Sequence, residues 1–203
     1  MKPAVAALAF FLAACHYDPP IDNKLDDKRG EAVARESAEA AFARYRRPDL
    51  IIGALVLHGG ERVADVGAGD GFLSVPLAEA VGKTGLVVAT DVDEQALGRL
   101  RARALAATGA RIETRHVSGD DQGLGDDHFD VILLSEVDQL LADRAGFLAR
   151  LRPHLKEGGR LVVCNRRGDR LALMAAATAA GLTRVSEFSG LPAHFLITFG
   201  VTK

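Results

Sequence analysis

Segments with strand-like and helix-like patterns alternate along the sequence from Glu31 to the C-terminus. Short apolar runs rich in Val, Ile and Leu are separated by Ala- and Leu-rich stretches with helical spacing. Because parallel strands need helical crossovers between them, this alternation predicts an α/β fold with a mostly parallel sheet. The predicted strands lie at about 62–66, 86–90, 111–117, 129–134, 160–164, 184–188 and 195–201.

The last two predicted strands differ from the others because no helix lies between them. Only residues 189–193 join them, and so short a connection predicts an antiparallel hairpin. With 203 residues, of which 48% are hydrophobic, the chain is long enough for one domain with a sizeable core. We therefore expect a single domain over 31–203, preceded by a short appendage.

The appendage has the pattern of a bacterial lipoprotein signal. An apolar run over 4–12 follows the positive N-terminus and leads into Leu-Ala-Ala-Cys, which resembles a lipobox ending at Cys15. We expect residues 1–14 to be a cleaved signal peptide and Cys15 to be lipidated, which places the domain on the periplasmic side of a membrane. Residues 15–30 are charged and contain two prolines, as is typical of a tether. If the signal is not used, we expect a cytoplasmic protein.

Composition narrows the classes of partner. The formal net charge is −2 and Trp is absent, which disfavours nucleic acid, since nucleic-acid binders need basic surfaces or stacking aromatic side chains. The two cysteines exclude a disulfide framework, and the histidines show no metal-ligand spacing. We therefore predict no nucleic-acid partner and no metal site.

A glycine-rich turn between a predicted strand and a predicted helix gives the clearest binding signal. The segment VADVGAGDG over 63–71 places Gly67, Gly69 and Gly71 at every second position. Glycines allow positive φ and close approach of a ligand, and the helix that follows offers N–H groups to an anion. The dinucleotide fingerprint G-x-G-x-x-G fails because its third glycine falls on Phe72. A nicotinamide-dependent oxidoreductase is therefore disfavoured.

Acidic side chains follow successive predicted strands. Asp91 ends the second strand, where a carboxylate can accept both hydroxyls of a ribose. Asp120 and Asp121 follow the third strand, where a carboxylate can accept from the exocyclic amine of a base. Open α/β sheets bind ligands at the carboxyl ends of their strands. Together with the glycine turn, these acids predict a ligand that contains a nucleoside.

Four stretches, in order, resemble class I S-adenosylmethionine-dependent methyltransferases, in particular their small-molecule branch. They are VADVGAGDGFLS (63–74), GLVVATDVDEQAL (85–97), VSGDDQGLGDDHFDVILLSEV (117–137) and LKEGGRLVVCNRRG (155–168). The resemblance implies a Rossmann-like sheet of seven strands in the order 3-2-1-4-5-7-6, with strand 7 antiparallel and helices on both faces. It also implies methyl transfer from S-adenosylmethionine to a small-molecule acceptor.

The same resemblance implies which residues bind the cofactor. The glycines of the turn would pack against its methionine part, and Asp65 would support the turn and the amino group. Asp91 would hold the ribose and Asp120 the adenine amine, while Ser135 and Glu136 would lie nearest the sulfonium. The full implied set is Asp65, Gly67, Ala68, Gly69, Gly71, Asp91, Val92, Asp120, Asp121 and Ser135.

The acceptor is expected beyond the fourth, fifth and sixth strands. Glu136 and Asp138 follow the fourth strand and are, with His194, the candidate catalytic residues. Arg166 and Arg167 follow the fifth strand and, again with His194, are candidates for binding the acceptor. Because these positions share one edge of the sheet, we expect all five side chains to line one pocket. A tandem arginine pair predicts an anionic acceptor.

Two departures from the family pattern bear on activity. Asp70 stands where Thr or Ser is frequent, which adds a negative charge near the cofactor's carboxylate. Close relatives often carry a His-His pair after the fourth strand, where this chain has Asp138-Gln139-Leu140. S-adenosylmethionine is made in the cytoplasm, whereas a lipidated Cys15 would lie outside the inner membrane. These points keep open an alternative, a catalytically silent lipoprotein that binds S-adenosylmethionine.

Overall fold

The structure is a computed structural model that describes residues 44–119 and 121–201. The predicted signal peptide, the tether, the predicted domain boundary at Glu31 and Asp120 all lie outside the described residues. A compact unit begins at Tyr45 and continues to the C-terminus. Within the described part of the chain, no helix has the length and hydrophobicity needed to cross a membrane.

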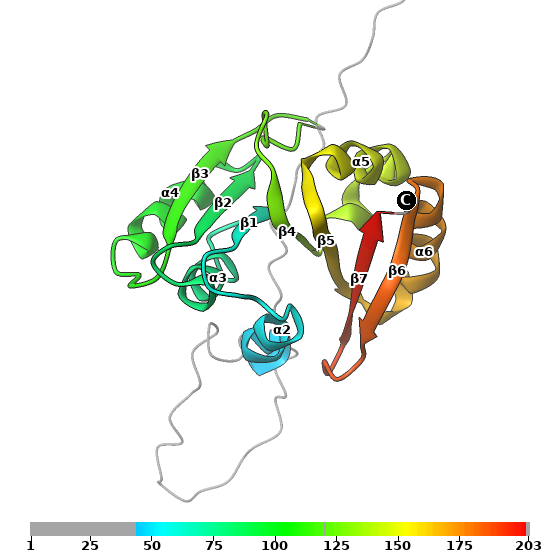
Figure 1. Cartoon of the computed structure of the whole chain (residues 1–203), viewed down its shortest axis with the longest axis horizontal. Coiled ribbons are helices and arrows are strands. Elements are labelled where there is room, and N and C mark those ends of the chain that lie inside the picture. The colour runs from blue at the N-terminus through cyan, green and yellow to red at the C-terminus, as the bar shows by residue number, and fades with distance from the viewer. Residues whose placement is uncertain (1–43, 120, 202–203) are drawn as a thin grey trace, which may run out of the picture. The chain divides into compact units, whose positions relative to one another are not determined.

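Seven strands form one sheet in the order β3-β2-β1-β4-β5-β7-β6 (Figure 1). Strands β1 to β5 pair in parallel, whereas β7 is antiparallel to both β5 and β6. The predicted sheet order and the antiparallel hairpin at the C-terminus are therefore confirmed. The strands are β1 (Arg62–Val66), β2 (Leu86–Asp91), β3 (Arg111–His116), β4 (Phe129–Ser135), β5 (Leu155–Arg166), β6 (Leu182–Phe188) and β7 (His194–Val201).

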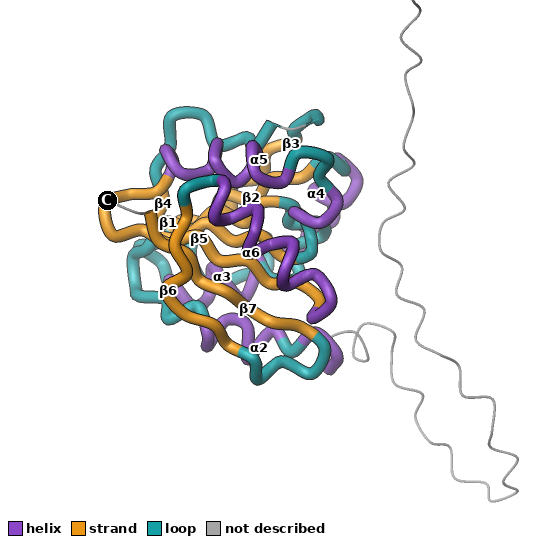
Figure 2. The backbone as a smooth tube through the Cα atoms, turned by 90° about the vertical axis from the view of Figure 1, so that its right-hand side faces the viewer, coloured by secondary structure: helices purple, strands orange, loops and turns teal. Residues whose placement is uncertain are grey.

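Helices cover both faces of the sheet, as the crossovers between parallel strands require. The α-helices are α2 (Pro48–Ala54), α3 (Ser74–Val81), α4 (Glu94–Ala104), α5 (Arg144–Leu151) and α6 (Arg170–Ala179). Helix α2 begins with a proline, which suits the first helical position. Helix α4 is capped by Asp93, whose Oδ1 accepts from the N–H groups of Gln95 and Ala96. Helices α5 and α6 lie side by side (Figures 1 and 2).

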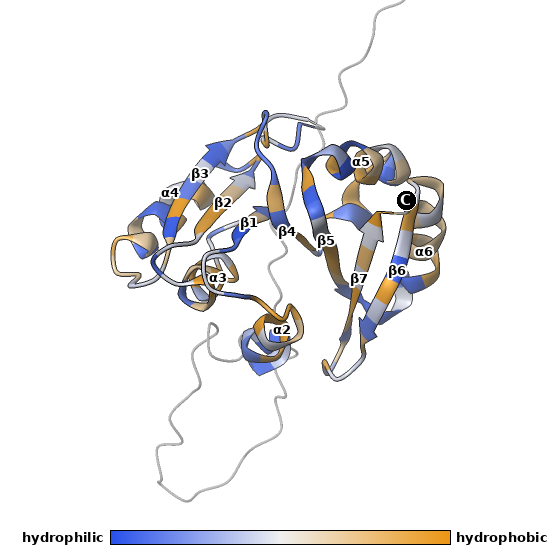
Figure 3. Ribbon diagram, in the orientation of Figure 1, coloured by the Kyte–Doolittle hydropathy of each residue, from blue (hydrophilic) through white to orange (hydrophobic). Residues whose placement is uncertain are grey.

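Alternate residues of the central strands face two separate cores. In β4, Val131 and Leu133 pack in the cluster that includes α3, whereas Ile132 and Leu134 pack in the cluster that includes α5 and α6. This is the side-chain period of two expected of a strand buried on both faces. At the sheet edge, β3 is mainly hydrophilic while its neighbour β2 is mainly hydrophobic (Figure 3), so β3 contributes little to the core.

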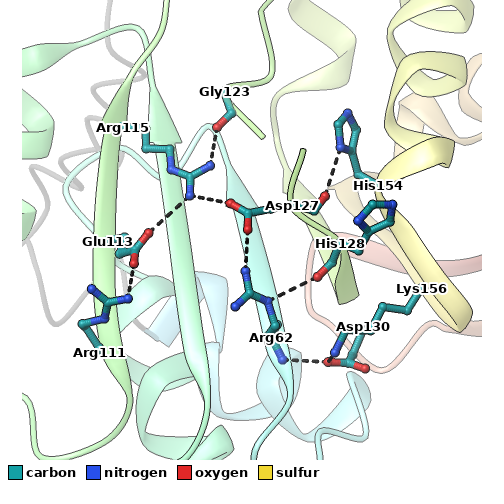
Figure 4. A network of polar contacts seen from close by, with 10 residues as sticks. All are labelled: Arg62, Arg111, Glu113, Arg115, Gly123, Asp127, His128, Asp130, His154 and Lys156. Carbon is teal, nitrogen blue, oxygen red and sulfur yellow. Dashed lines mark hydrogen bonds and ion pairs between the residues drawn. The ribbon is translucent and has the colours of Figure 1, made fainter. Parts of the chain in front are cut away.

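A network of charged side chains holds the segment between β3 and β4 (Figure 4). Arg115 of β3 donates to the carbonyl oxygen of Gly123 at 2.9 Å and to Asp127 Oδ2 at 2.6 Å. Arg62, which begins β1, donates to the other carboxylate oxygen of Asp127 at 2.7 Å. The N–H of Arg62 also donates to Asp130 Oδ2 at 2.8 Å. The backbone that follows the predicted adenine-binding acids is thereby fastened to two strands.

Candidate active site

The glycine turn lies between β1 and α3 and is tied to the end of β2. The N–H groups of Gly67 and Ala68 both donate to the carbonyl oxygen of Thr90, at 2.8 and 3.0 Å. Gly67, Gly69 and Gly71 have φ angles of 79°, 56° and 85°, which non-glycine residues rarely adopt. The sequence therefore needs glycine at all three positions for the path of the backbone alone.

Only the middle glycine leaves room for a ligand. A Cβ added to Gly67 would lie 2.2 Å from a Val137 methyl carbon, and one on Gly71 would lie 2.2 Å from a Leu100 methyl carbon. A Cβ on Gly69 would meet no heavy atom within 4 Å among the described residues. Gly67 and Gly71 thus allow close packing of the protein itself, while Gly69 exposes backbone beside open space.

Asp91 lies directly beside that open position. Its Oδ2 accepts from the N–H of Gly69 at 2.7 Å, and its Oδ1 accepts from the N–H of Asp93 at 2.8 Å. The carboxylate is thereby fixed between the glycine turn and the start of α4. Each carboxylate oxygen keeps a further lone pair for a hydroxyl of a ligand. The neighbouring Val92 is 41% exposed.

Asp65 is a buried acid below the glycine turn. It belongs to β1, is 2% exposed, and accepts a hydrogen bond from Ser74 Oγ at 2.6 Å. Burial raises the pKa of Asp65 to about 6, and the charge of Asp91 adds to this, whereas the Ser74 hydrogen bond and Arg46 act in the opposite direction. A group with this pKa changes its charge just below neutral pH.

Glu136, directly after β4, has an unusual backbone conformation. Its φ is 59°, in the left-handed region that β-branched and bulky residues avoid. Its N–H donates to the carbonyl oxygen of Cys164 at 2.9 Å and to Asn165 Oδ1 at 3.2 Å. Both partners belong to β5, so the turn after β4 is held by the neighbouring strand.

The Glu136 side chain is the centre of a charged cluster. Its Oε2 pairs with Arg46, which also donates to Ser135 Oγ at 2.7 Å. Its Oε1 accepts from Arg166 Nε at 3.1 Å and contacts His194 Nε2 at 2.8 Å. Burial acts to raise the pKa of Glu136, but the contacts with His194, Arg46 and Arg166 together lower it to about 2. Glu136 is therefore ionised at every physiological pH.

His194 is the most buried member of this cluster. It opens β7, pairs with Arg166 of β5 in the sheet, and is 1% exposed. The Tyr45 ring stands edge-on to its imidazole, with 5.5 Å between the ring centroids. Its Nδ1 is buried and has no hydrogen-bond partner in the described part of the chain. Glu136, Arg166 and His194 therefore lie together, as expected from the sequence.

Arg167 and Asp138 correct the expectation of one shared pocket. Arg167 donates to the carbonyl oxygens of Ser189 and Leu191, at 3.1 and 2.8 Å, because the turn between β6 and β7 needs donors for these groups. Asp138 has no exposed surface and accepts from Asn165 Nδ2 at 2.7 Å. Both side chains thus support the fold beside the cluster and do not join it.

Two side chains that organise the site gave no clear signal in the sequence. Arg46 precedes α2 and reaches a partner 90 positions later in the chain. Asn165 is fully buried in β5 and joins the backbone of Glu136 to Asp138 and Asp169. The sequence gives one hint for Asn165, which is that this polar residue directly follows the apolar run over 161–164.

Comparisons with known proteins agree with this geometry. Residues 64–161 match the family model described as "Methyltransferase domain". Over 106 residues the chain is 34% identical to a ubiquinone biosynthesis O-methyltransferase from Ruegeria sp. (strain TM1040), which covers 52% of this chain and 41% of the relative. It is 31% identical over 106 residues to the ubiquinone/menaquinone biosynthesis C-methyltransferase UbiE of Psychromonas ingrahamii, which covers 51% and 42%. The chain thus spans less than half the length of these relatives.

A solved structure shows the same fold. The SAM dependent methyltransferase from Aquifex aeolicus superimposes with a TM-score of 0.72 at 19% identity, over 80% of this chain and 93% of that chain. This likeness shows that the chain has a Rossmann-like fold, with the sheet order described above. That solved protein is named as a SAM dependent methyltransferase, and residues 64–161 of this chain match the methyltransferase-domain model.

The described residues fit the cofactor of that class. The open space at Gly69 would admit the methionine part, and the fixed Asp91 carboxylate beside it has lone pairs for the ribose hydroxyls. Asp121 is exposed and accepts from the N–H of Gly123 at 2.9 Å. Nothing in the geometry of these three positions conflicts with S-adenosylmethionine as the cofactor.

Proposed function

We propose that the protein transfers the methyl group of S-adenosylmethionine to a small-molecule acceptor. The observation that supports this most strongly is the open backbone at Gly69 beside the fixed carboxylate of Asp91, within a methyltransferase domain. The relatives are named for ubiquinone and menaquinone biosynthesis, which favours a small organic acceptor over a macromolecule.

The residues of the chain chiefly bind, orient and exclude water. S-adenosylmethionine supplies a methyl group already activated on a sulfonium, so transfer is a displacement at carbon with donor and acceptor held at about 3–3.5 Å. In this proposal Asp91 holds the ribose, and Asp120 accepts from the adenine amine with the help of Asp121. Ser135 and Glu136 at the end of β4 border the reacting groups, because Val137 packs directly against Gly67.

Replacing Asp91 by Asn should weaken binding of S-adenosylhomocysteine by about 10- to 100-fold, because charge-assisted hydrogen bonds to the ribose are lost. Isothermal titration calorimetry on the full chain measures this. Asp126→Asn, a change of the same kind on an exposed loop, is the matched control and should bind like the wild type. Wild-type affinity in Asp91→Asn would remove Asp91 from the site, and equally tight binding of NADH would overturn the class of ligand.

A catalytically silent binder of the same cofactor is the second candidate. It is favoured by the burial of Asp138, because the segment after β4 then presents no free acid or base. Incubation with methyl-labelled S-adenosylmethionine and a small-molecule extract of the host separates the two candidates. Label in a small molecule supports the enzyme, whereas binding without any transfer supports the silent protein.

Mass spectrometry of the protein from its host tests the proposed removal of residues 1–14 and lipidation of Cys15.

A further inference from the structure

We propose that Arg46 holds the place of the cofactor's sulfonium beside Glu136, and that binding of S-adenosylmethionine displaces Arg46 about a hinge at Arg47. This inference rests on the methyl transfer proposed above. Ser135 and Glu136 at the end of β4 are the residues proposed to border the reacting groups, and Arg46 contacts both of them. A guanidinium and a sulfonium each carry one positive charge, so they compete for the same carboxylate.

The Arg46 guanidinium is held in a site with little water. Its Nη1 pairs with Glu136 Oε2, and its Nη2 donates to Ser135 Oγ at 2.7 Å. The side chains of Arg46 and Glu136 are only 9% and 10% exposed. Burial strengthens the attraction between them, because the effective dielectric constant is lower there than in water. A second cation can therefore use Glu136 Oε2 only if the guanidinium leaves.

Arg46 also lies close to the segment that would hold the methionine part of the cofactor. Its guanidinium carbon is 5.8 Å from the centroid of the Phe72 ring, directly after the glycine turn. Burial raises the pKa of Asp65 below the turn, and the charge of Arg46 acts against this rise. Val137 lies so close to Gly67 that an added Cβ would be 2.2 Å from its methyl carbon. The guanidinium thus lies where the end of β4 approaches the turn.

Glu136 keeps its charge and its position when Arg46 leaves, because its two oxygens have different partners. Arg46 pairs with Oε2, whereas Arg166 Nε and His194 Nε2 contact Oε1 at 3.1 and 2.8 Å. The backbone N–H of Glu136 is bound to β5 and does not depend on Arg46. Displacement of Arg46 therefore frees one oxygen of a carboxylate that remains ionised and fixed.

The backbone at Arg47 provides a hinge for this movement. Tyr45 and Arg46 are helical, and α2 begins two residues after Arg46. Arg47, which lies between the two helical segments, has φ 49° and ψ 64°. This left-handed conformation is unfavourable for a residue that is not glycine, so a rotation that leaves it releases strain. Tyr45 stands edge-on to His194, with 5.5 Å between the ring centroids, and moves with Arg46.

Helix α2 itself stays in place during this movement. Ile51 in the middle of the helix is fully buried. The carbonyl oxygen of Leu55, directly after the helix, accepts from Arg160 Nη2 at 2.9 Å. Arg160 belongs to β5 and also pairs with Glu61. The hinge therefore separates Arg46 from a helix that is fastened to the sheet.

The exchange of one cation for another couples the position of Arg46 to the state of the cofactor. While the sulfonium is present, it is the counter-ion of Glu136 Oε2, and Arg46 is displaced. Methyl transfer leaves a neutral thioether, so this oxygen lacks a counter-ion until Arg46 returns. A ligand shifts such an equilibrium by the difference in its affinity for the two states. The return of Arg46 therefore favours release of S-adenosylhomocysteine.

Two ligands that differ by one charge provide the test. S-adenosylmethionine and S-adenosylhomocysteine share the adenine, ribose, ammonium and carboxylate groups, and differ by the methyl group and the positive charge on sulfur. Arg46→Gln removes the competing charge. We expect the Kd of S-adenosylmethionine to fall about tenfold or more, and that of S-adenosylhomocysteine to change less than about threefold. Isothermal titration calorimetry on the full chain measures both values.

Arg184→Gln is the matched control. Arg184 and Arg170 share the carboxylate of Glu187 on β6, outside the cluster around Glu136. The control should leave both Kd values unchanged. A ratio of the two Kd values that stays the same in Arg46→Gln, or that changes in favour of S-adenosylhomocysteine, would overturn the proposal. Failure of the wild-type chain to bind either ligand would instead overturn the proposed function.

Limited proteolysis of the wild-type chain tests the displacement without any variant. Trypsin cuts after arginine unless proline follows, so it can cleave after Arg46 but not after Arg47, which precedes Pro48. Mass spectrometry identifies the fragment that begins at Arg47. We expect saturating S-adenosylmethionine to speed this cleavage by about threefold or more, because cleavage reports the population of the displaced state. Cleavage that is unchanged or slower with S-adenosylmethionine would contradict the displacement.

Discussion

Replacing Asn165 by Leu should lower the free energy of unfolding by about 3–5 kcal/mol, the usual cost of breaking a buried polar network that contains charges. Asn165 Nδ2 donates to Asp138 Oδ1 at 2.7 Å and to Asp169 Oδ2 at 2.9 Å. Its Oδ1 accepts from the N–H of Glu136 at 3.2 Å. Leucine has the same branched shape but makes none of these hydrogen bonds, so a fully buried carboxylate loses its amide partner. Urea unfolding of the full chain measures the change.

The expected loss exceeds that of an ordinary core substitution because like charges are involved. Burial raises the pKa of Asp138, and the nearby Asp169 raises it further, while Asn165 and Arg144 lower it. Thr198→Val, on the neighbouring strand β7, is a matched control that also removes a buried polar group. It should cost less than about 1.5 kcal/mol, the usual upper net contribution of one neutral hydrogen bond. An equally small effect of Asn165→Leu would show that Asn165 does not hold the two carboxylates.

The network around Asn165 also explains how a glutamate can occupy a left-handed conformation. The φ of 59° at Glu136 is unfavourable, and hydrogen bonds from its N–H to β5 compensate for it. This backbone conformation accompanies the contacts of the Glu136 side chain with Arg46, Arg166 and His194. Asn165 therefore acts as a positioning residue for the cluster, through the backbone of its central acid.

The sheet and the glycine turn could be predicted because both depend on local patterns. Short apolar runs, helical spacing and glycine at 67, 69 and 71 are all features of short segments. The placement of Asp91 beside the turn follows from parallel pairing, since β1 and β2 end at the same edge. The resemblance to a known family added the strand order, which local patterns do not determine.

The cluster around Glu136 could not be predicted in full because its members come from distant segments. Arg46 and Glu136 are 90 positions apart, and their contact depends on a positive φ at a residue that is not glycine. We expected Arg166 and His194 beside Glu136 because all three positions lie at the same edge of the sheet, and the structure places them there. It failed for Arg167, the next residue, because topology assigns an edge but not the direction of a side chain.

Asp65 gives the second large expected effect, a pH dependence of stability. Its pKa is about 6 in the folded protein and about 4 in an unfolded chain, so the folded state binds more protons between these values. Stability from this group is therefore highest at low pH and falls as pH rises through 4 to 6. The fall should amount to about 2–3 kcal/mol between pH 4 and pH 7.5.

Asp65→Asn should remove this fall, because an amide does not titrate in this range. Burying the amide changes the free energy of unfolding by the same amount at every pH. The difference in pH dependence between wild type and Asp65→Asn therefore reports the titration of Asp65 alone. Urea unfolding at pH 4, 5, 6 and 7.5 measures it, with Asp126→Asn as the exposed control. Parallel curves for wild type and Asp65→Asn would contradict the raised pKa.

Asp65→Asn should affect protein stability and cofactor binding in opposite directions. A charged Asp65 is costly in the free protein because it is buried and lies near Asp91. The proposed cofactor brings an ammonium group to this region, and a positive charge there would offset the cost and lower the pKa of Asp65. Asp65→Asn should therefore weaken binding of S-adenosylhomocysteine at pH 7.5 while it removes the stability cost of the charged acid. Unchanged affinity would mean that the ammonium group lies elsewhere and that the buried charge has no role in holding the cofactor.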